Sequence, residues 1–455
     1  MVNFFKISRF FLYVSVFCVI IVTSSTLFPF IVGKYVFFRG IVDLTLIFFL
    51  LGVIFSRGEW DALRVRAKQV FHHPLFIAVS IFALMFLLAS LFAYDSGAAF
   101  WSNFERGDGG LQMLHFYIFF LLLSLLFRSE AEWKKIFTFS LAAAGLVILY
   151  GIATSLGVSS FIGPEGFCGR VAGSLGNPAY FAPYLMFMMF YALWLWFSKK
   201  QNPPRNVLFI SLLIVLVFFF LLSQTRGAFL GLGLGVIVAL LYLAFALPRG
   251  RWKKISAVLA GLCIVFAGLA FTFRQENIPL VPFCKTSSRL LDVSTSDKTA
   301  QTRLWTWGSA IKGWQERPVL GWGPENFGVV FDRHFDTRHF TPGQNSETWF
   351  DRAHSVFFDY LAETGILGLV SFLGIFVTFF WQIIKYRREF VARHHPYGYL
   401  FTALFLAIPV GYLGQGVALF DVLPIYLNVF LFLAFALHLF LEMKEKHAME
   451  VVRHN

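Results

Sequence analysis

The amino-acid sequence predicts an all-α polytopic membrane protein with about twelve transmembrane helices and one large, partly helical extracytoplasmic loop. Its 455 residues are 58% hydrophobic and only 14% charged, and the mean hydropathy is +0.70. Soluble domains carry about 25% charged residues, so a chain of this composition would have an insoluble surface in water. The composition therefore excludes a water-soluble enzyme and a disordered tail.

Twelve apolar runs are long enough to cross a bilayer, which takes roughly 20 residues in a helix. The first run follows Lys6 and Arg9 but is too long for the apolar core of a signal peptide, so we interpret it as an anchor. We assign residues 1–273 to helices one to nine, 365–441 to helices ten to twelve, and 442–455 to a cytoplasmic tail. The runs cover residues 10–32, 35–56, 74–93, 111–127, 136–157, 177–198, 206–224, 227–247, 254–273, 365–384, 398–420 and 422–441.

The basic residues are distributed unevenly between the two sides of these helices. With the N-terminus inside, the inner segments carry 23 of the 38 Lys and Arg residues but only 8 of the 25 Asp and Glu residues. Inner segments of membrane proteins are enriched in Lys and Arg in this way. The formal charge of +13 therefore reports topology. The lipid bilayer is a partner, and nucleic acid is excluded.

The segment 274–364 lies outside in this topology and is too long for a simple connector. From Thr302 onward, apolar residues recur at helical spacing until Pro318 ends the pattern. The apolar positions are Leu304, Trp307, Ile311 and Trp314. We expect this amphipathic helix to lie on the membrane surface with its indoles on one face.

A second helix in the loop is predicted to begin near Asp351, which is a suitable N-cap, and to end at Gly365. This prediction places His354 in the first turn. An ordinary histidine titrates near neutral pH and can accept or donate a proton, so His354 is a candidate catalytic residue. The alternative is a structural histidine, since the chain contains eleven. The neighbouring Arg352 is a candidate for substrate contact or for a structural role.

Two arginines are candidates for binding a phosphate group. The sequence contains neither the nucleotide-binding motif GxxxxGK[ST] nor the serine-nucleophile motif GxSxG. An enzyme on the outer face must use a substrate that brings its own leaving group. Lipid-linked diphosphates fit this need, and they require cations. Arg226 stands between two apolar runs, where a charge is costly, although it could also extend towards the interface. Arg303 opens the predicted loop helix, where N–H groups favour anions; the alternative is a solvated charge.

Other polar residues have simpler interpretations. Asn177 precedes Pro178 and most simply begins a helix, so direct substrate contact is the less favoured role. Arg39 and Asp43 are four residues apart on one helix and are predicted to pair. The acidic residues of the first sizeable outer loop are candidates for a metal site, but solvation in the loop is favoured. These acidic residues are Asp95, Glu105 and Asp108.

Four stretches in this order resemble the O-antigen ligase and O-antigen polymerase superfamily, which includes protein O-oligosaccharyltransferases. They are GRVAGSLGNPAYFAPYL (169–185), LLSQTRGAFLGL (222–233), RLWTWGSAIKGWQERPVLGWGPENF (303–327) and DRAHSVFFDYLAETGILG (351–368). The resemblance implies that Arg226 and Arg303 bind the donor diphosphate and that His354 is the catalytic residue. Relatives often have a second Asn where this chain has Ala179, which weakens a substrate role for Asn177.

The resemblance also implies the reaction. A metal-independent, cofactor-free glycosyltransferase would transfer a glycan from undecaprenyl diphosphate to an acceptor hydroxyl with inversion. The reaction would take place at the extracytoplasmic face of the bacterial cytoplasmic membrane. Lipid A core, a growing glycan and a protein hydroxyl all remain open as acceptors. Two other classes remain as alternatives: a transporter of lipid-linked glycans, and a metal-dependent glycosyltransferase that uses the three acidic residues of the outer loop.

The chain contains four cysteines. Cys18 and Cys263 fall within predicted spans, whereas Cys168 and Cys284 fall in outer segments, where oxidation to a disulfide is possible. The alternatives for the second pair are a bridge and two separate thiols.

Overall fold

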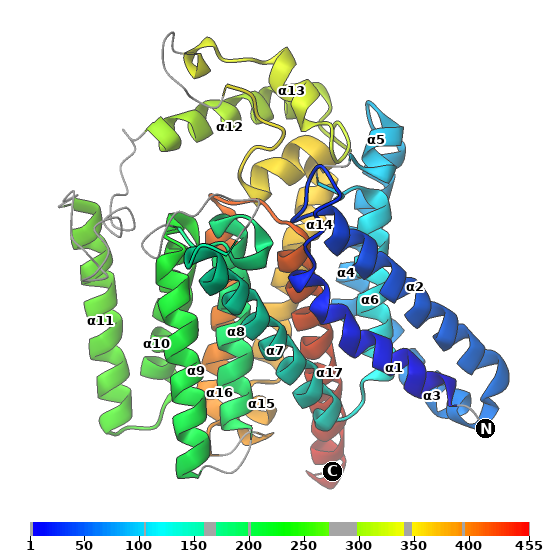
Figure 1. The fold of residues 1–455 in the computed structure, drawn as a ribbon. Coiled ribbons are helices and arrows are strands. Elements are labelled where there is room, and N and C mark those ends of the chain that lie inside the picture. Colours follow the sequence, from blue (N-terminus) through cyan, green and yellow to red (C-terminus); the bar gives the residue numbers. More distant parts are fainter. Residues whose placement is uncertain are drawn as a thin grey trace. The chain divides into compact units, whose positions relative to one another are not determined.

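A computed structural model describes residues 3–103, 106–158, 170–198, 202–272, 298–340, 348–393 and 396–454. Within these ranges all regular structure is helical, and no strand occurs. Figure 1 shows the helices with their labels. The chain forms two compact units. Unit 1 comprises residues 1–139, 298–382 and 420–455, and unit 2 comprises residues 140–297 and 383–419. The all-α prediction is confirmed.

The helices divide between the two units along the chain, and α7 and α14 each begin in unit 1 and end in unit 2. Unit 1 contains α1 (Phe4–Ser15), η1 (Val16–Ile20), α2 (Val32–Phe55), α3 (Arg57–Phe71), α4 (Pro74–Leu91), α5 (Ser96–Trp101), α6 (Gly110–Leu126), the start of α7 (Glu130–Ser155), α12 (Lys298–Glu316), α13 (Phe327–Arg333), η4 (Thr337–His339), most of α14 (Val356–Lys385) and α17 (Leu423–His454). Unit 2 contains the rest of α7, η2 (Gly173–Leu175), α8 (Pro178–Phe197), α9 (Pro203–Leu222), α10 (Arg226–Ala246), α11 (Arg251–Thr272), α15 (Arg387–Arg393) and α16 (Gly398–Gly416).

Ten helices among the described residues are long and apolar enough to cross a membrane, which supports a multi-pass membrane protein. They are α2, α4, α7, α8, α9, α10, α11, α14, α16 and α17. The remaining two of the twelve predicted spans form shorter helices. The run at 111–127 becomes α6, which has 17 residues.

The first predicted span, 10–32, is wrong as a continuous helix. Helix α1 ends at Ser15, and a short 3₁₀ segment ends at Ile20. Hydroxyl side chains and a proline follow, and the N–H of Thr23 donates to the carbonyl of Pro29 instead of to a helical partner. Such local bonds compete with the helix, and an apolar composition does not reveal them.

Aromatic packing joins the long helices of unit 1. Phe116 of α6 stacks on Phe430 of α17 with ring centroids 5.6 Å apart, and it also contacts Tyr426. The predicted pair between Arg39 and Asp43 is wrong, because each side chain bonds to α6 instead. Arg39 donates to the Gln112 side chain at 2.7 Å, and Asp43 contacts His115 at 3.1 Å. Gln112 and His115 are buried, so each bond gives a partner to a buried side chain of α6. A pair between Arg39 and Asp43 within α2 would not provide these partners.

In unit 2, glycines on α10 allow α16 to come close. A Cβ on Gly231 would lie 2.4 Å from the carbonyl oxygen of Gly411, and one on Gly235 would lie 2.8 Å from that of Ala407. Small residues four apart let two membrane helices approach backbone to backbone. Gly231 and Gly235 thus serve the packing of α10 against α16.

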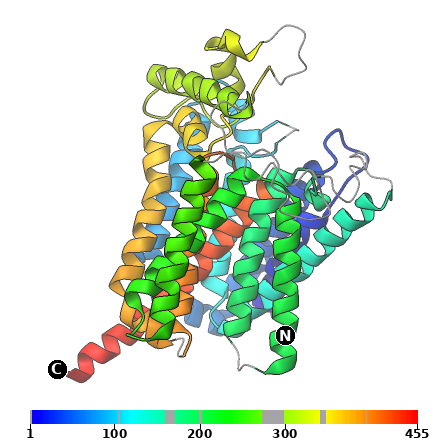
Figure 2. The ribbon, with the colours of Figure 1, turned by 90° about the vertical axis from the view of Figure 1, so that its left-hand side faces the viewer.

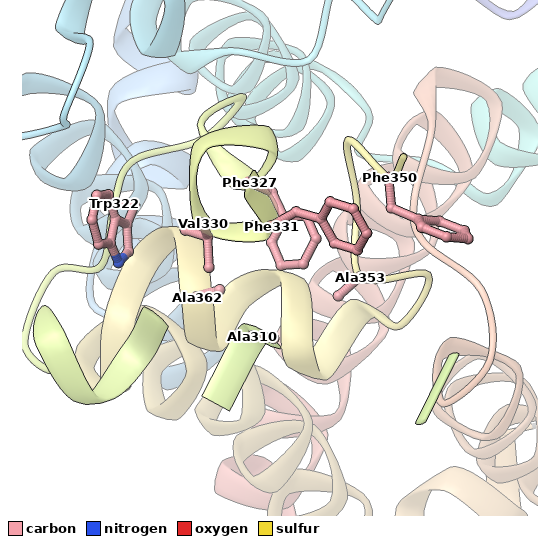
Figure 3. Packing of buried hydrophobic residues seen from close by; sticks show 8 residues of the cluster. All are labelled: Ala310, Trp322, Phe327, Val330, Phe331, Phe350, Ala353 and Ala362. Atoms are coloured by element: carbon pink, nitrogen blue, oxygen red, sulfur yellow. The ribbon is translucent and has the colours of Figure 1, made fainter. Parts of the chain in front are cut away.

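The described part of the long loop is also folded. Helices α12 and α13 lie beyond one end of the long helices of unit 1 (Figures 1 and 2). Buried side chains of these helices, of α14 and of the segments between them form a small hydrophobic core, which Figure 3 shows: Ala310, Trp322, Phe327, Val330, Phe331, Phe350, Ala353 and Ala362. The predicted loop helix is confirmed and ends before Pro318. Its indoles do not form a free face, because Trp307 stacks on Phe358 of α14 and the indole N–H of Trp314 donates to the carbonyl of Pro318.

Gly365 interrupts α14 and connects it to the loop. Its φ of +64° is left-handed, so the next two N–H groups turn away from the helix. They donate to the carbonyls of Pro318 and Val319, while the carbonyls of Ala362 and Glu363 accept from Trp322 and Gly323. An intact helix would have paired these four groups with one another. The predicted helix end at Gly365 is therefore confirmed as a break, and residues 366–385 continue as the predicted span.

We predict that Gly365→Ala destabilises the protein by at least about 2 kcal/mol, because a left-handed β-carbon costs about 1–2 kcal/mol and forced overlap about 1–3 kcal/mol. The added Cβ would lie 2.3 Å from the carbonyl oxygen of Val319. The thermal unfolding midpoint of the purified protein in detergent tests this expectation. The matched control is Gly374→Ala in the same helix, where a Cβ would meet open space and the alanine should be neutral or slightly stabilising. Equal midpoints for the two variants would contradict the expectation.

Candidate active site

His354 lies just before α14 in a strained backbone conformation. Its φ is +57°, in the left-handed region that residues with a β-carbon rarely adopt. The predicted helix start at Asp351 is wrong, because α14 begins at Val356 and His354 therefore precedes the helix. Such a conformation costs about 1–3 kcal/mol and persists only where the surroundings enforce it.

Strained residues are concentrated in the stretches that the sequence singled out. Among the described non-glycine residues, four have a positive φ. One is His354, another is Glu325, which bonds to Arg352, and a third is Gln224, two residues before Arg226. The fourth is Ser102. Because strain of this kind clusters at functional sites, this distribution favours a functional site at these stretches.

Three consecutive residues, 352–354, are held by polar contacts from other segments. The N–H of Ala353 donates to a carboxylate oxygen of Asp359 at 2.6 Å, and its carbonyl accepts from the indole N–H of Trp307 at 3.0 Å. The backbone N–H of Ala353 is therefore fixed by α14, and its carbonyl is fixed by α12.

The Arg352 side chain is clamped between two buried carboxylates. Its guanidinium donates to both oxygens of Glu363, at 3.0 and 2.9 Å, and to Glu325. The two glutamates are only 2% and 1% exposed, so removing one partner would leave an uncompensated buried charge. Burial by itself lowers the pKa of Arg352, but the nearby carboxylates outweigh it and raise the pKa well above the usual value. These contacts favour a structural role for Arg352 over substrate contact.

The imidazole of His354 is held in one tautomer. Its Nδ1 lies 3.1 Å from the carbonyl oxygen of Arg352. A carbonyl only accepts hydrogen bonds, so Nδ1 carries the hydrogen and Nε2 keeps its lone pair. The ring edges meet Phe350 and Phe420, with centroids 5.3 and 5.1 Å away. The geometry therefore presents Nε2 as a hydrogen-bond acceptor.

The surroundings also keep this imidazole neutral. Burial is the main cause that lowers the pKa of His354 to about 4, and the charges of Arg303 and Arg106 lower it further. The hydrogen bond to Arg352 and the charge of Asp351 act in the opposite direction but are outweighed. At neutral pH the imidazole can accept a proton, although its lowered pKa makes it a weak base.

Arg106 adds a second ion pair beside the histidine. It bonds both oxygens of Asp351, at 2.7 and 3.0 Å, and its guanidinium lies over the Phe420 ring at 5.1 Å. Burial raises the pKa of Asp351, but the bond to Arg106 and the nearby cations outweigh it, so the pKa is below the usual value. Asp351 is thus engaged by Arg106 and does not cap α14 as predicted.

The acidic residues considered for a metal site lie in different environments. Asp95 caps α5, where its carboxylate accepts from the N–H of Ala98. Asp108 is buried, which raises its pKa to about 7 against the lowering effect of Arg352, Arg106 and Arg39. Glu105 lies outside the described residues. Within the described ranges, no three His, Cys, Asp or Glu side chains are grouped so that they could hold a metal ion.

Arg303 and His354 belong to the same unit. Helix α12 begins at Lys298, so Arg303 is in its second turn and does not open the helix as predicted. Residues 298–301, which are polar except for Ala300, extend the helix beyond the apolar pattern that was used to place its start. The free N–H groups of the first turn therefore do not surround Arg303, and its case as an anion ligand depends on its guanidinium.

Arg226 and Asn177 belong to unit 2. Arg226 is the first residue of α10, and Thr225 before it donates its hydroxyl to the carbonyl of Pro178 at 3.0 Å. Asn177 caps α8 through a bond from the N–H of Ala179, as the helix-start interpretation predicts. The guanidinium of Arg170 donates to the carbonyl of Ser223, so residues 170–178 support the segment that leads to Arg226.

The cysteine predictions are tested in part. Cys18 lies in η1 and Cys263 in α11, and both are free thiols. Cys168 and Cys284 lie outside the described residues, and their bridge remains a prediction.

Sequence reasoning missed the residues that position His354. Asp359 and Glu363 are acidic residues in an otherwise apolar stretch, where a charge is costly unless it is paired. That signal could have indicated buried cationic partners. Nothing in the spacing identified Glu325, Trp307 or Phe420, because they come from segments far apart in the sequence.

Two comparisons with known proteins show what this chain is similar to. Residues 211–373 match the O-antigen ligase family. The chain is also 23% identical over 270 residues to the ComP-specific O-oligosaccharyltransferase of Acinetobacter baylyi, and the match covers 56% of this chain and 45% of the relative's length. The matched family segment contains Arg226, Arg303 and His354 but not Asn177. The resemblance derived from the sequence motifs is confirmed.

We predict that the acid limb of the pH–rate profile that belongs to His354 lies near pH 4. The folded-state pKa is below the ordinary value of about 6.5, so the neutral base persists above pH 4 and is lost as the pH falls through that value. The profile of kcat/KM against pH reports the pKa of the free enzyme. In Arg303→Ala the limb should move to higher pH, because a cation that lowers the histidine pKa is removed.

The matched control is Arg338→Ala. Arg338 is exposed and pairs with Asp336, so its removal should leave the limb in place. A wild-type limb near pH 6.5, or an equal shift in both arginine variants, would contradict the electrostatic account of His354.

Proposed function

Because the chain belongs to the O-antigen ligase superfamily, whose members are glycosyltransferases, we propose that it transfers a glycan from undecaprenyl diphosphate to an acceptor hydroxyl. The observation that carries the proposal is the geometry of His354. A neutral imidazole presents an unprotonated Nε2 in a strained loop, and the charge of Arg303 acts on the same ring.

The proposed reaction is a single displacement. The acceptor oxygen attacks the anomeric carbon as the bond to the diphosphate breaks, so the configuration inverts. Nε2 of His354 accepts the hydroxyl proton, and the diphosphate leaves with both bonding electrons. Arg303 and Arg226 bind the diphosphate oxygens, since guanidinium groups match phosphate geometry and stabilise the developing charge. No metal ion is required in this scheme.

Donor binding also activates the base in this proposal. A diphosphate bound at Arg303 compensates the positive charge that lowers the His354 pKa. The pKa rises as a result, and the imidazole accepts a proton more readily. The base therefore gains strength when the donor is in place.

We predict that Arg226→Ala and Arg303→Ala each weaken donor binding by about tenfold to a hundredfold, because a charge-assisted bond contributes about 1.5–3 kcal/mol. Lysine should rescue only partly, since it lacks the bidentate fork. His354→Ala should keep donor affinity but lose about 10²–10⁴ in transfer rate, the usual contribution of a general base. Donor-lipid binding is paired with single-turnover transfer on purified variants, in the presence of a chelator.

Arg338→Ala serves again as the control for loss of an exposed cation. A His354→Ala variant that transfers glycan at more than about a tenth of the wild-type rate would exclude the general-base role. Transfer that fails only when the chelator is added would favour the metal-dependent alternative. Purified protein that moves lipid-linked glycan across liposomes without transfer would favour a transporter.

The topology has its own test. We predict that the C-terminus is cytoplasmic and that residues 298–340 are extracytoplasmic, because the predicted inner segments hold most of the Lys and Arg residues. A reporter that is active only in the cytoplasm should work at the C-terminus, and one that is active only outside should work within the loop. The opposite pattern would move the proposed active site to the other face.

The acceptor separates a ligase from its two close alternatives. The relative is named for transfer specific to ComP, which favours testing a protein hydroxyl beside lipid A core and a growing glycan. Mass spectrometry of the surface glycoconjugates in a deletion strain distinguishes them: lost glycan on lipid A core indicates a ligase, shortened glycan a polymerase, and unmodified protein an oligosaccharyltransferase.

A further inference from the structure

Trp307 connects the helix that carries Arg303 to the residue before His354. Its indole N–H donates to the carbonyl of Ala353 at 3.0 Å, and its ring stacks on Phe358 with centroids 4.8 Å apart. Arg303 and Trp307 are four residues apart on α12, so their side chains leave the helix on the same face. The same face of α12 therefore carries Arg303, which is proposed to bind the donor, and Trp307, which bonds to the backbone next to His354.

The same backbone unit is held from its other side. The N–H of Ala353 is bound by Asp359, and the Arg352 side chain is bound by Glu325 and Glu363. Residues 352 and 353, which precede the left-handed His354, are therefore held by several bonds. Rotation of the 353–354 peptide would change the φ of His354 and reorient its imidazole, and the bond from Trp307 to the carbonyl of Ala353 opposes that rotation.

Hydrophobic packing explains why an aromatic ring is present at position 307. It does not explain why the indole N–H points at the carbonyl of Ala353. The ring lies against the loop core and against Phe358, and a phenylalanine could maintain much of that contact. The N–H is directed at a backbone carbonyl one residue before the histidine. Hydrophobic packing at position 307 would not require this hydrogen bond.

We propose that Trp307 is a positioning residue for the transfer reaction: through its N–H bond to Ala353 it sets the orientation of the His354 imidazole relative to Arg303. The inference rests on the proposed function, since it assumes that His354 is the base and Arg303 a donor ligand. Trp307 does not touch the reacting atoms in this account. Its loss should therefore slow the transfer step and leave donor binding intact.

The test compares Trp307→Phe with Trp314→Phe. Trp314 lies on the same helix and also donates its indole N–H to a backbone carbonyl, that of Pro318 at 3.1 Å. It therefore controls for the general loss of an indole and its bond. Donor-lipid affinity and the single-turnover transfer rate are measured for both variants and for His354→Ala, together with the thermal unfolding midpoint.

We expect Trp307→Phe to lose about tenfold to a hundredfold in transfer rate, since a misplacement of about 1 Å at a reacting group has an effect of this order. Its donor affinity should stay within about twofold, and Trp314→Phe should stay within about twofold in both measurements, because neither change removes a charge-assisted contact. A Trp307→Phe rate equal to that of Trp314→Phe would overturn the proposal. Equal losses of rate and donor affinity would also overturn it, because they would indicate a general structural role.

If Trp307→Phe lowers the unfolding midpoint, benzothienylalanine at position 307 replaces it. This residue keeps the bicyclic ring but has sulfur in place of the N–H, so packing is preserved while the bond to Ala353 is lost. A wild-type transfer rate in this variant overturns the proposal. Full transfer by His354→Ala overturns the proposed function as well, whereas an inactive His354→Ala with unaffected position-307 variants overturns the positioning role alone.

Discussion

Four backbone hydrogen bonds join α14 to the loop at residues 318–323, and they form because Gly365 interrupts the helix. The break releases two N–H groups and two carbonyls, and the loop supplies complementary groups to all four. A buried backbone group without such a partner would be costly, especially near a membrane. Glycine meets the steric requirement, since a β-carbon at Gly365 would overlap the carbonyl of Val319.

This connection positions the proposed active site. The loop that pairs with the carbonyls of Ala362 and Glu363 continues to Glu325, and the Glu363 side chain meets Arg352. Glu325 and Glu363 hold Arg352 two residues before His354. Helix α12 contributes Arg303 and the Trp307 bond to the same region. The first nine residues of α14 therefore act as a support on which the loop and the histidine are both assembled.

Charge and burial are balanced differently for the residues of this region. Arg352 and Asp351 each have opposite charges in direct contact, so they remain ionised despite burial. His354 has no carboxylate at hydrogen-bond distance among the described residues, and nearby cations add to the effect of burial, so it remains neutral. Ion pairs thus supply rigidity, while the histidine keeps the lone pair that proton transfer requires.

The sequence by itself determined the all-α membrane class, ten of the twelve spans, the helix that ends before Pro318 and the break at Gly365. These features depend on apolar length, helical periodicity and the special roles of proline and glycine, which are local properties of the chain. It also indicated Arg226, Arg303 and His354 through motifs, whose catalytic assignment remains a proposal. Only the tertiary structure decided the bonds of Arg39 and Asp43 to α6, the ion pair of Asp351 with Arg106, and the contacts of Trp307, Glu325 and Glu363 around residues 352–354. The physical reason is that each buried polar group pairs with whichever partner the packing brings within reach, and those partners are far apart in the sequence.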